Sequence, residues 1–493
     1  MEPINNNVSR ETSTLPTVLE RIVDKRRADL PRIAARIAHV EFDSLSKSTR
    51  SLYDNLKRGG RGGAAYIMEC KKASPSLGLI REHFNPADIA RVYSRYAAGI
   101  SVLCEPEFFD GDYDHLQTVA ASTHLPVLCK DFIIDPVQIH AARYFGADAI
   151  LLMLSVLSDE EYRSLSQLAA HYDMDVLTEV IDANEVARAI RLGARIFGIN
   201  HRNLHDLSID LSRSAALSAL LPEDAVVIAE SGIRDNATVR RLSTHCNGFL
   251  VGSQLTSQPD IDRAARMLVY GPNKVCGLTT PAAAQAARAV GATYGGLIFE
   301  AKSPRNVSRE TSEKIIAEEP NLNYVAVSRR TTGWHELIQP GITAVQIHSP
   351  YQGSIDDELA LVARVRQEIP ADVAVWRAVS MTETYGPEWA IAMAKATDML
   401  VLDSGAGGTG TSFDWSVIPE EVTATALIAG GISPTNISTA LATGCVGVDL
   451  NSGVEYGSAT TDHWQGTKDT AALAQAFSTI RTFHFGTHEK EIV

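Results

Sequence analysis

Short apolar runs alternate with amphipathic helical patterns along most of the chain. In the first half these runs cover residues 64–70, 100–104, 126–130, 149–154, 175–180, 196–200, 225–230 and 248–252. Helical periodicity separates them, for example over 87–97, 136–145, 159–171 and 183–192. Short strands joined by crossover helices are typical of a parallel sheet, and eight such runs predict a closed barrel.

The second half repeats this pattern. Its apolar runs cover residues 273–277, 294–299, 324–328, 344–348, 374–379, 399–403, 426–429 and 447–451. The turn Ser231-Gly232-Ile233 corresponds to Gly430-Gly431-Ile432, and Ser253 corresponds to Ser452 at the same spacing. Gly271 and Pro272 break the helix before them. We therefore expect an α/β protein of two tandem (β/α)8 TIM barrels, residues 1–270 and 271–493.

An amphipathic helix is predicted before the first barrel, over residues 15–40, within a helical extension of about residues 1–62. Leu19, Ile22 and Val23 share its apolar face. We expect Lys25-Arg26-Arg27 to form a solvated face, with a phosphate or substrate contact as the alternative.

Composition places the protein among globular proteins of a reducing compartment. Hydrophobic residues make up 45% of the 493 positions. There is neither an apolar run long enough to span a membrane nor an apolar signal region near Met1, and the six cysteines lack zinc-site spacing. A formal net charge of -14 opposes binding to nucleic acid or to anionic membranes. We expect a cytoplasmic monomer without metal or cofactor.

Polar residues end nearly every strand of the first half, where barrels of this class carry their chemistry. An acid and a base, Glu69 and Lys71, share one face at the end of the first strand. Such a pair alone is as consistent with a structural ion pair as with a site. The other strand ends supply Glu105, Lys130, Glu179, Asn200 with Arg202, Glu230 with Ser231, and Ser253. So many polar groups at one mouth indicate a catalytic site.

The loops after strands seven and eight carry small residues with free backbone N–H groups, which is where barrels hold a phosphate. These residues are Ser231, Gly232, Gly252 and Ser253. Lysines and glutamates above a phosphate cradle favour acid/base chemistry on a sugar phosphate. We expect the crowded cationic surroundings of a lysine here to ease the loss of its proton.

Six motifs of the first half resemble indole-3-glycerol phosphate synthase. They are Glu-Cys-Lys-Lys-Ala-Ser-Pro-Ser (69–76), Leu-Cys-Lys-Asp-Phe-Ile-Ile-Asp-Pro (128–136), Leu-Leu-Met-Leu-Ser-Val-Leu (151–157), Leu-Thr-Glu-Val (177–180), Gly-Ile-Asn (198–200) and Glu-Ser-Gly-Ile (230–233). That family closes carboxyphenylamino-deoxyribulose phosphate to indole glycerol phosphate with loss of carbon dioxide and water.

The resemblance assigns roles to the strand-end residues. Lys130 would be the general acid of ring closure, and Glu179 the acid/base group of dehydration. Lys71 would bind the anthranilate carboxylate. The remaining positions would hold hydroxyls and lysines (Glu69, Asn200), pack on the aromatic ring (Phe132), complete the polar shell (Arg202, Glu230) or face the phosphate (Ser74, Ser231, Gly232, Gly252, Ser253).

In the second half, Cys276 ends the first predicted strand and Asp403 ends the sixth. A lone buried cysteine is most often a small apolar residue. At a strand end opposite a carboxylate, however, a thiolate base and a carboxylic acid form a pair suited to proton transfer. The loops at Gly430-Gly431 and Asn451-Ser452-Gly453 again predict a phosphate site.

Residues 405–410 fit G-x-G-x-x-G after a strand, but no helix opens directly behind them, and no acidic residue some twenty positions on is apparent in a βαβ unit. We therefore interpret them as a mobile active-site loop rather than a dinucleotide site.

The second half resembles phosphoribosylanthranilate isomerase. The motifs are Gly-Leu-Ile-Phe (296–299), Ser-Pro-Arg (303–305), Val-Gln-Ile-His (345–348) and Val-Asp-Leu-Asn-Ser-Gly-Val-Glu (448–455), with the runs at Cys276, Asp403 and Gly430. The resemblance makes Asp403 the acid that opens the furanose, Cys276 the base at C2, and Arg305 the carboxylate contact. Gln346 and His348 would also bind substrate.

The product of the isomerase is the substrate of the synthase, so the two resemblances predict a bifunctional lyase and isomerase of tryptophan biosynthesis. Its partners would be small phosphosugar–anthranilate molecules. Two alternatives stay open at this point. The second half could act on a related phosphoribosyl amine, as in histidine synthesis, or one barrel could be a non-catalytic scaffold.

Overall fold

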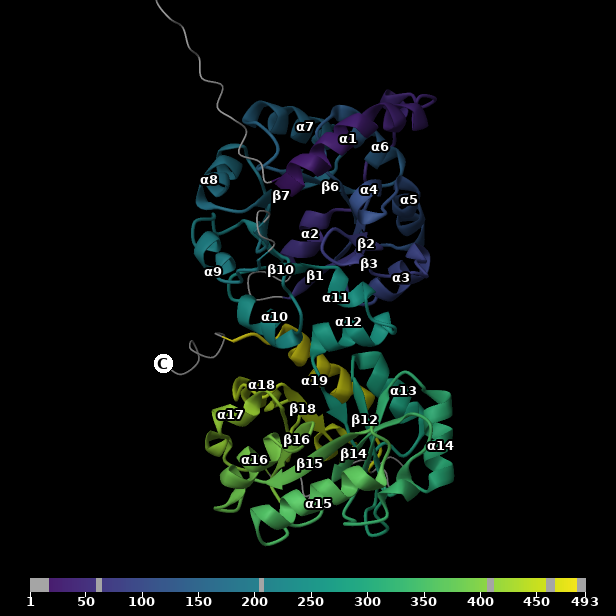
Figure 1. The fold of residues 1–493 in the computed structure, drawn as a ribbon, viewed down its shortest axis with the longest axis vertical. Helices are drawn as coiled ribbons and strands as arrows, with labels where there is room; N and C mark the ends of the chain where they lie inside the picture. Colours follow the sequence, from purple (N-terminus) through teal and green to yellow (C-terminus); the bar gives the residue numbers. More distant parts are fainter. Residues whose placement is uncertain (1–16, 59–63, 204–207, 406–411, 458–465, 486–493) are drawn as a thin grey trace, which may run out of the picture. The chain divides into compact units, whose positions relative to one another are not determined.

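The computed structural model describes residues 17–58, 64–203, 208–405, 412–457 and 466–485. It contains two closed barrels, each of eight parallel strands. In each barrel the helices enclose the ring of strands (Figure 1). The prediction of two (β/α)8 barrels is confirmed.

By their contacts the residues divide into two compact units. The first unit runs to Ile233 and also includes His245–Pro259, and the second combines Arg234–Thr244 with the chain from Asp260 onward. The helices α10 (Asn236–Leu242) and α12 (Ile261–Tyr270) therefore belong to the second unit.

The first barrel closes in the order β1-β10-β9-β8-β7-β6-β5-β4. Its strands are β1 (Ala65–Cys70), β4 (Gly99–Leu103), β5 (Val127–Lys130), β6 (Ala149–Met153), β7 (Asp175–Val180), β8 (Ile196–Asn200), β9 (Val226–Glu230) and β10 (Gly248–Val251). A small antiparallel hairpin of β2 (Ala73–Ser74) and β3 (Gly78–Leu79) follows β1. The helices are α1 (Thr17–Arg36), η1 (Phe42–Ser44), α2 (Leu52–Lys57), α3 (Pro86–Tyr93), α4 (Pro106–Phe109), α5 (Tyr113–Ser122), α6 (Pro136–Tyr144), α7 (Asp159–His171), α8 (Ala183–Arg191), α9 (Arg213–Ser218) and α11 (Ser253–Thr256).

The helix α1 packs on the first barrel through the apolar face that the sequence indicates. Leu19 and Val23 join a buried cluster with Leu56 of α2 and Ile67 of β1. Lys25 and Arg27 are exposed as expected. Arg26 is not, because it lies one helical turn beyond Ile22 and Val23 on the same face. Its side chain is 1% exposed and forms an ion pair with Asp131, so the expectation of a solvated face is wrong at this residue.

The second barrel closes in chain order. Its strands are β11 (Lys274–Val275), β12 (Tyr294–Ile298), β13 (Asn323–Ser328), β14 (Ile342–Ile347), β15 (Ala374–Ser380), β16 (Met399–Asp403), β17 (Ala426–Ile428) and β18 (Gly447–Leu450). The helices are α13 (Pro281–Val290), α14 (Arg309–Glu318), η2 (Trp334–Leu337), α15 (Ile355–Glu368), α16 (Gly386–Ala394), η3 (Trp415–Val417), α17 (Glu420–Thr423), α18 (Ile437–Ala442), η4 (Ser452–Val454) and α19 (Thr470–Thr482). The strand predicted over 273–277 is shorter because Gly277 adopts a φ of 70°. Within the residues described, no helix combines the length and apolarity that crossing a membrane requires.

Candidate active sites

Four charged side chains form a continuous row at the carboxyl ends of the first barrel's strands. Lys71 Nζ lies 2.6 Å from Glu69 Oε1, and Lys130 Nζ lies 3.5 Å from Glu69 Oε2. Lys130 Nζ also donates to Glu230 Oε2 at 3.0 Å. The structure thus brings together residues that are far apart in the sequence, with signs that alternate along the row.

The expectation that Lys130 loses its proton easily in cationic surroundings is wrong. Burial disfavours its charged form, but Glu230, Glu69 and Glu179 outweigh burial and raise the pKa of Lys130 above its ordinary value. The surroundings are anionic rather than cationic, so Lys130 keeps its proton. Burial alone would raise the pKa of Glu69, yet Lys71 and Lys130 hold it below the ordinary value.

Glu179 differs from Glu69 in that its pKa is raised rather than lowered. Its carboxylate is almost fully buried at the end of β7, and Asn200 Nδ2 donates to its Oε1 at 3.2 Å. Burial, followed by the nearby charge of Glu230, raises the pKa of Glu179 to about 8. A carboxyl group that is protonated at neutral pH can donate a proton as a general acid.

The other residues predicted for this mouth lie around the row. The Arg202 N–H donates to Asn200 Oδ1 at 2.9 Å, and Phe132 packs against the apolar cluster beneath. Ser74 Oγ accepts from the Leu77 N–H within the β2–β3 hairpin. Ser231 and Gly232 both adopt positive φ, and Ser253 begins α11.

Gly252 leaves room for the ion pairs of this mouth. A Cβ at this position would lie 2.3 Å from Glu69 Oε1 and 3.2 Å from Lys71 Nζ. Gly198 does the same for Glu230, whose Oε1 would be 2.0 Å from an added Cβ. Sequence reasoning missed Gly198, although it stands within the motif at 198–200.

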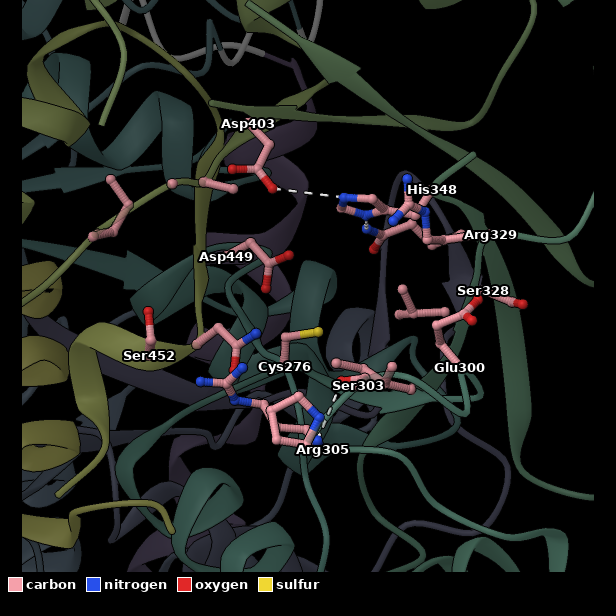
Figure 2. Close-up of a pocket in the computed structure, with 18 of the residues that line it drawn as sticks. Cys276, Glu300, Ser303, Arg305, Ser328, Arg329, His348, Asp403, Asp449 and Ser452 are labelled. Atoms are coloured by element: carbon pink, nitrogen blue, oxygen red, sulfur yellow. Dashed lines mark hydrogen bonds and ion pairs between the residues drawn. The ribbon is translucent and has the colours of Figure 1, made fainter. Parts of the chain in front are cut away.

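In the second barrel a pocket of about 310 Å³ opens at the carboxyl ends of the strands. Every residue predicted for this site lines it: Cys276, Arg305, Gln346, His348, Asp403, Gly430, Gly431, Asn451, Ser452 and Gly453. Figure 2 shows Cys276, Asp403, Asp449 and His348 around one space, with Ser452 and Ser328 on opposite sides.

The two candidate proton-transfer groups differ in their electrostatics. Burial raises the pKa of Asp403 above its ordinary value, although the Ser404 N–H donates to its Oδ1 at 2.7 Å. Burial also raises the pKa of the Cys276 thiol, and the nearby Lys274 opposes this effect. Burial therefore favours a protonated thiol, whereas the sequence led us to expect a thiolate.

A buried polar network, part of which sequence reasoning missed, lies beneath Cys276. Lys274 Nζ donates to Asp449 Oδ2 at 2.6 Å and to Gln346 Oε1 at 2.8 Å. Gln346 Nε2 lies 3.2 Å from His348 Nδ1, and His348 Nε2 lies 3.7 Å from Asp403 Oδ2. Burial lowers the pKa of His348 to about 4, so its ring is neutral. Strand alternation could have found Lys274, which stands two residues before Cys276.

Arg305 enters the pocket held by a carboxylate. Its Nε and Nη2 donate to the two oxygens of Glu455 at 2.8 and 2.7 Å. Lys468 Nζ donates to Glu455 Oε1 at 2.6 Å and to Asn451 Oδ1 at 3.0 Å. Two cations around one carboxylate leave this side of the pocket positive, which suits an anionic substrate.

The loops after β17 and β18 contain backbone positions that favour glycine. Gly430 and Gly431 adopt φ of 80° and 67°, and a Cβ at Gly453 would lie 2.0 Å from the carbonyl oxygen of Ile432. These are positions that only glycine fills without strain. Most of the glycine-rich loop predicted over 405–410 lies outside the described residues.

Among the described side chains, no group of three or more His, Cys, Asp or Glu residues is arranged to hold a metal ion. The expected absence of a cofactor stays a prediction.

Comparisons with known proteins find matches to both halves of the chain. The family model for indole-3-glycerol phosphate synthase matches residues 19–268, and the model for N-(5'-phosphoribosyl)anthranilate isomerase matches residues 273–477. A tryptophan biosynthesis protein TrpCF from Corynebacterium glutamicum is 66% identical over 474 residues, which cover 96% of this chain and 100% of the relative. A protein of the same name from Yersinia pestis is 44% identical and covers 95% of each chain. Among solved structures, phosphoribosyl anthranilate isomerase from Thermus thermophilus matches with a TM-score of 0.36 and 24% identity, over 43% of this chain and 100% of that chain.

The two family matches fall on the two barrels whose strand ends carry the candidate sites. The chain belongs to the bifunctional TrpCF family, whose members join an indole-3-glycerol phosphate synthase to a phosphoribosylanthranilate isomerase in tryptophan biosynthesis.

Proposed function

We propose that Asp403 and Cys276 are the acid and the base of the isomerase reaction, which converts N-(5-phosphoribosyl)anthranilate to 1-(2-carboxyphenylamino)-1-deoxyribulose 5-phosphate. Asp403 gives its proton to the ring oxygen as the C1–O bond breaks, leaving an open-chain iminium ion. The Cys276 thiolate then removes the C2 proton, and the freed electron pair forms the C1=C2 bond and neutralises the nitrogen. Transfer of a proton from the C2 hydroxyl to C1 completes the ketose.

The observation that carries this assignment is the shared pocket. Cys276 and Asp403 come from strands at different places in the ring, yet they line one space together with the glycine loops at 430–431 and 452–453. The raised pKa of Asp403 favours the protonated form that an acid needs.

Anions of the substrate would take two sides of this pocket. We assign the phosphate to the backbone N–H groups around Gly430, Gly431 and Ser452–Gly453, with Asn451 beside them. We assign the anthranilate carboxylate to Arg305, through the Nη1 group that Glu455 does not engage. Within the described residues, His348 Nε2 is buried without a hydrogen-bond partner, so with Gln346 it is positioned to bind a sugar hydroxyl.

In the first barrel we assign ring closure to Lys130 and dehydration to Glu179. Lys130 would protonate the carbonyl oxygen as the aromatic carbon attacks and carbon dioxide leaves, and Glu179 would protonate the hydroxyl that departs as water. Glu69, Glu230 and Asn200 would fix these two groups. We assign Lys71 to the anthranilate carboxylate, Phe132 to the aromatic ring of the substrate and Arg202 to the polar shell. The phosphate would be bound by Ser74, Ser231, Gly232, Gly252 and Ser253.

We place the boundary between the two catalytic parts at residues 270/271, which fits family matches that end at residue 268 and resume at residue 273. We further propose a monomer in the cytoplasm. The six cysteines are buried and unpaired, as in proteins of a reducing compartment.

The test uses the full-length chain with phosphoribosylanthranilate as its sole substrate, with anthranilate fluorescence and indole absorbance followed together. With wild-type protein, the anthranilate fluorescence should change as the substrate is used, and indole absorbance should appear. Cys276→Ala should abolish both changes, yet still convert added carboxyphenylamino-deoxyribulose phosphate to indole glycerol phosphate. Full isomerase activity in Cys276→Ala would contradict the assignment of the base.

A further inference from the structure

The lysine beneath Cys276 occupies an unusual position for a cation. Lys274 is fully buried on β11, and Cys276, two residues further on, directly follows that strand. Removing an ammonium from water is costly unless it is paired. Asp449 and Gln346 accept hydrogen bonds from Lys274 Nζ, and the charge of Lys274 favours the thiolate form of Cys276.

The neighbouring strand is shaped around this contact. A Cβ at Gly296 of β12 would lie 2.6 Å from Cys276 Sγ and 2.9 Å from Lys274 Cε. The absence of a side chain at Gly296 therefore lets the thiol and the lysine stem lie next to each other. The ion pair of Lys274 with Asp449 lies toward β18 and does not itself require a glycine on β12.

A purely structural explanation accounts for part of the arrangement. Lys274 and Asp449 are partners in the register of β11 and β18, the pair of strands that closes the ring. Buried ion pairs are, however, weak contributors to stability, and apolar residues of similar volume often serve as well. Barrel closure alone does not call for a buried cation whose stem lies against the same glycine as a nucleophilic sulfur.

Four charged groups from different elements act on the Cys276 thiol. Lys274 on β11 and Lys468 before α19 favour the thiolate, as does Arg305 from the loop after β12, whereas Asp449 on β18 opposes it. Asp449 binds Lys274 directly, and its Oδ1 is buried without a hydrogen-bond partner among the described residues. The balance between Lys274 and Asp449 therefore sets how much positive charge the sulfur receives.

We propose that Lys274 is a positioning residue of the isomerase, whose buried ammonium supplies the counter-charge that allows Cys276 to act as a base. Asp449 moderates this effect by sharing the same ammonium. A substrate hydroxyl that donates to Asp449 Oδ1 would weaken its hold on Lys274 and favour the thiolate when the pocket is filled. The inference rests on the role proposed above for Cys276.

The test measures the thiolate directly. Full-length wild-type, Lys274→Met and Asp449→Asn proteins are alkylated with iodoacetamide across a pH series, and modification of the Cys276 peptide is quantified by mass spectrometry. Thiolates react and thiols do not, so the midpoint of the rate profile reports the pKa of Cys276. All five tryptophans lie between residues 334 and 464, so tryptophan fluorescence shows whether the second barrel is folded in each variant.

We expect the midpoint to rise by at least about one pH unit in Lys274→Met and to fall in Asp449→Asn, because the first change removes a cation and the second an anion. The acidic limb of kcat/KM for the isomerase should move in the same directions, with a loss of about tenfold or more at pH 7 in Lys274→Met. Lys314→Met, at an exposed position of α14, is the control. Neither its alkylation profile nor its kcat/KM profile should differ from that of the wild-type protein.

Shifts of opposite sign support the inference, because simple damage to the barrel would move both variants the same way. An unmoved midpoint in folded Lys274→Met overturns it. If Lys274→Met does not fold, Asp449→Asn decides, and a midpoint that stays or rises there overturns the inference. The role of Cys276 is tested separately by Cys276→Ala, so failure of one proposal is distinguishable from failure of the other.

Discussion

Glu179 and Asp403 both have a raised pKa, and burial at the end of a barrel strand is the main cause in each case. Both side chains lie at a barrel mouth and are largely shielded from water. The partner groups differ. Lys130 is surrounded by carboxylates that keep it charged, while nearby cations lower the pKa of Cys276 against the effect of burial.

The pKa of Glu179 predicts how the synthase responds to pH. With a folded-state pKa of about 8, Glu179 is protonated below that pH and loses its proton above it. If the protonated form is the acid of dehydration, turnover of carboxyphenylamino-deoxyribulose phosphate should fall as the pH rises through about 8. Steady-state kcat measured between neutral and alkaline pH checks this.

The variant Glu179→Gln should lose about a hundredfold or more in kcat, since an amide cannot donate the proton. Glu160→Gln, on the exposed side of α7, should keep both the rate and the pH profile. An alkaline limb that survives unchanged in any residual Glu179→Gln activity would show that another group titrates there.

A second prediction at the scale of residues concerns Gly252. In Gly252→Ala the new Cβ would meet Glu69 Oε1 at 2.3 Å, which forces the Glu69–Lys71 pair to move. Displacing a catalytic constellation by about 1 Å can cost about a hundredfold in rate. We expect synthase kcat/KM to fall at least tenfold, while isomerase activity of the same preparation stays at the wild-type level. Equal losses in both activities would indicate general misfolding instead.

At the scale of elements, α1 is tied to the strand that carries Lys130. Arg26 Nε donates to Asp131 Oδ1 at 2.9 Å, and Asp131 also accepts from Tyr113 Oη at 2.9 Å. The Asp131 side chain has no exposed surface. The N-terminal helix is therefore anchored by a buried charge at Asp131, the residue directly after Lys130.

Removing this anchor should destabilise the first barrel. Arg26→Ala leaves the Asp131 carboxylate buried without its cation, which costs about 3 kcal/mol or more. Loss of synthase activity in urea should then occur at a midpoint about 1 M lower than in the wild-type protein. Arg27→Ala, on the exposed face of the same helix, should leave the midpoint within experimental scatter. An unshifted midpoint in Arg26→Ala would mean that the ion pair contributes nothing net.

At the scale of the whole molecule, each barrel carries a complete candidate site built from its own strands. Cys276→Ala and Lys130→Met should therefore fail at different steps, each by a factor of about a hundred or more. A mixture of the two variants should restore conversion of phosphoribosylanthranilate to indole glycerol phosphate, because one supplies the intermediate and the other consumes it. A mixture that produces no indole absorbance would contradict independent sites.

The sequence alone determined the fold and was enough to select the candidate site residues. Strand and helix periods are local, so the two sets of eight strands could be read directly from apolar runs. The strand-end rule for such barrels then points to Lys130, Glu179, Cys276 and Asp403. Arg26 was assigned to solvent because three consecutive basic residues outweighed its place on the apolar face.

Only the tertiary structure decided the charges. The pKa of a side chain depends on neighbours that the barrel closure brings from distant strands, as Glu230 comes to Lys130 and Asp449 comes to Lys274. The sequence therefore could not show that Lys130 lies among anions, that Arg305 is held by Glu455, or that Lys274 is buried and paired with Asp449 near Cys276. Local pattern specifies which residues reach the mouth of a barrel, and the closed ring specifies which of them meet.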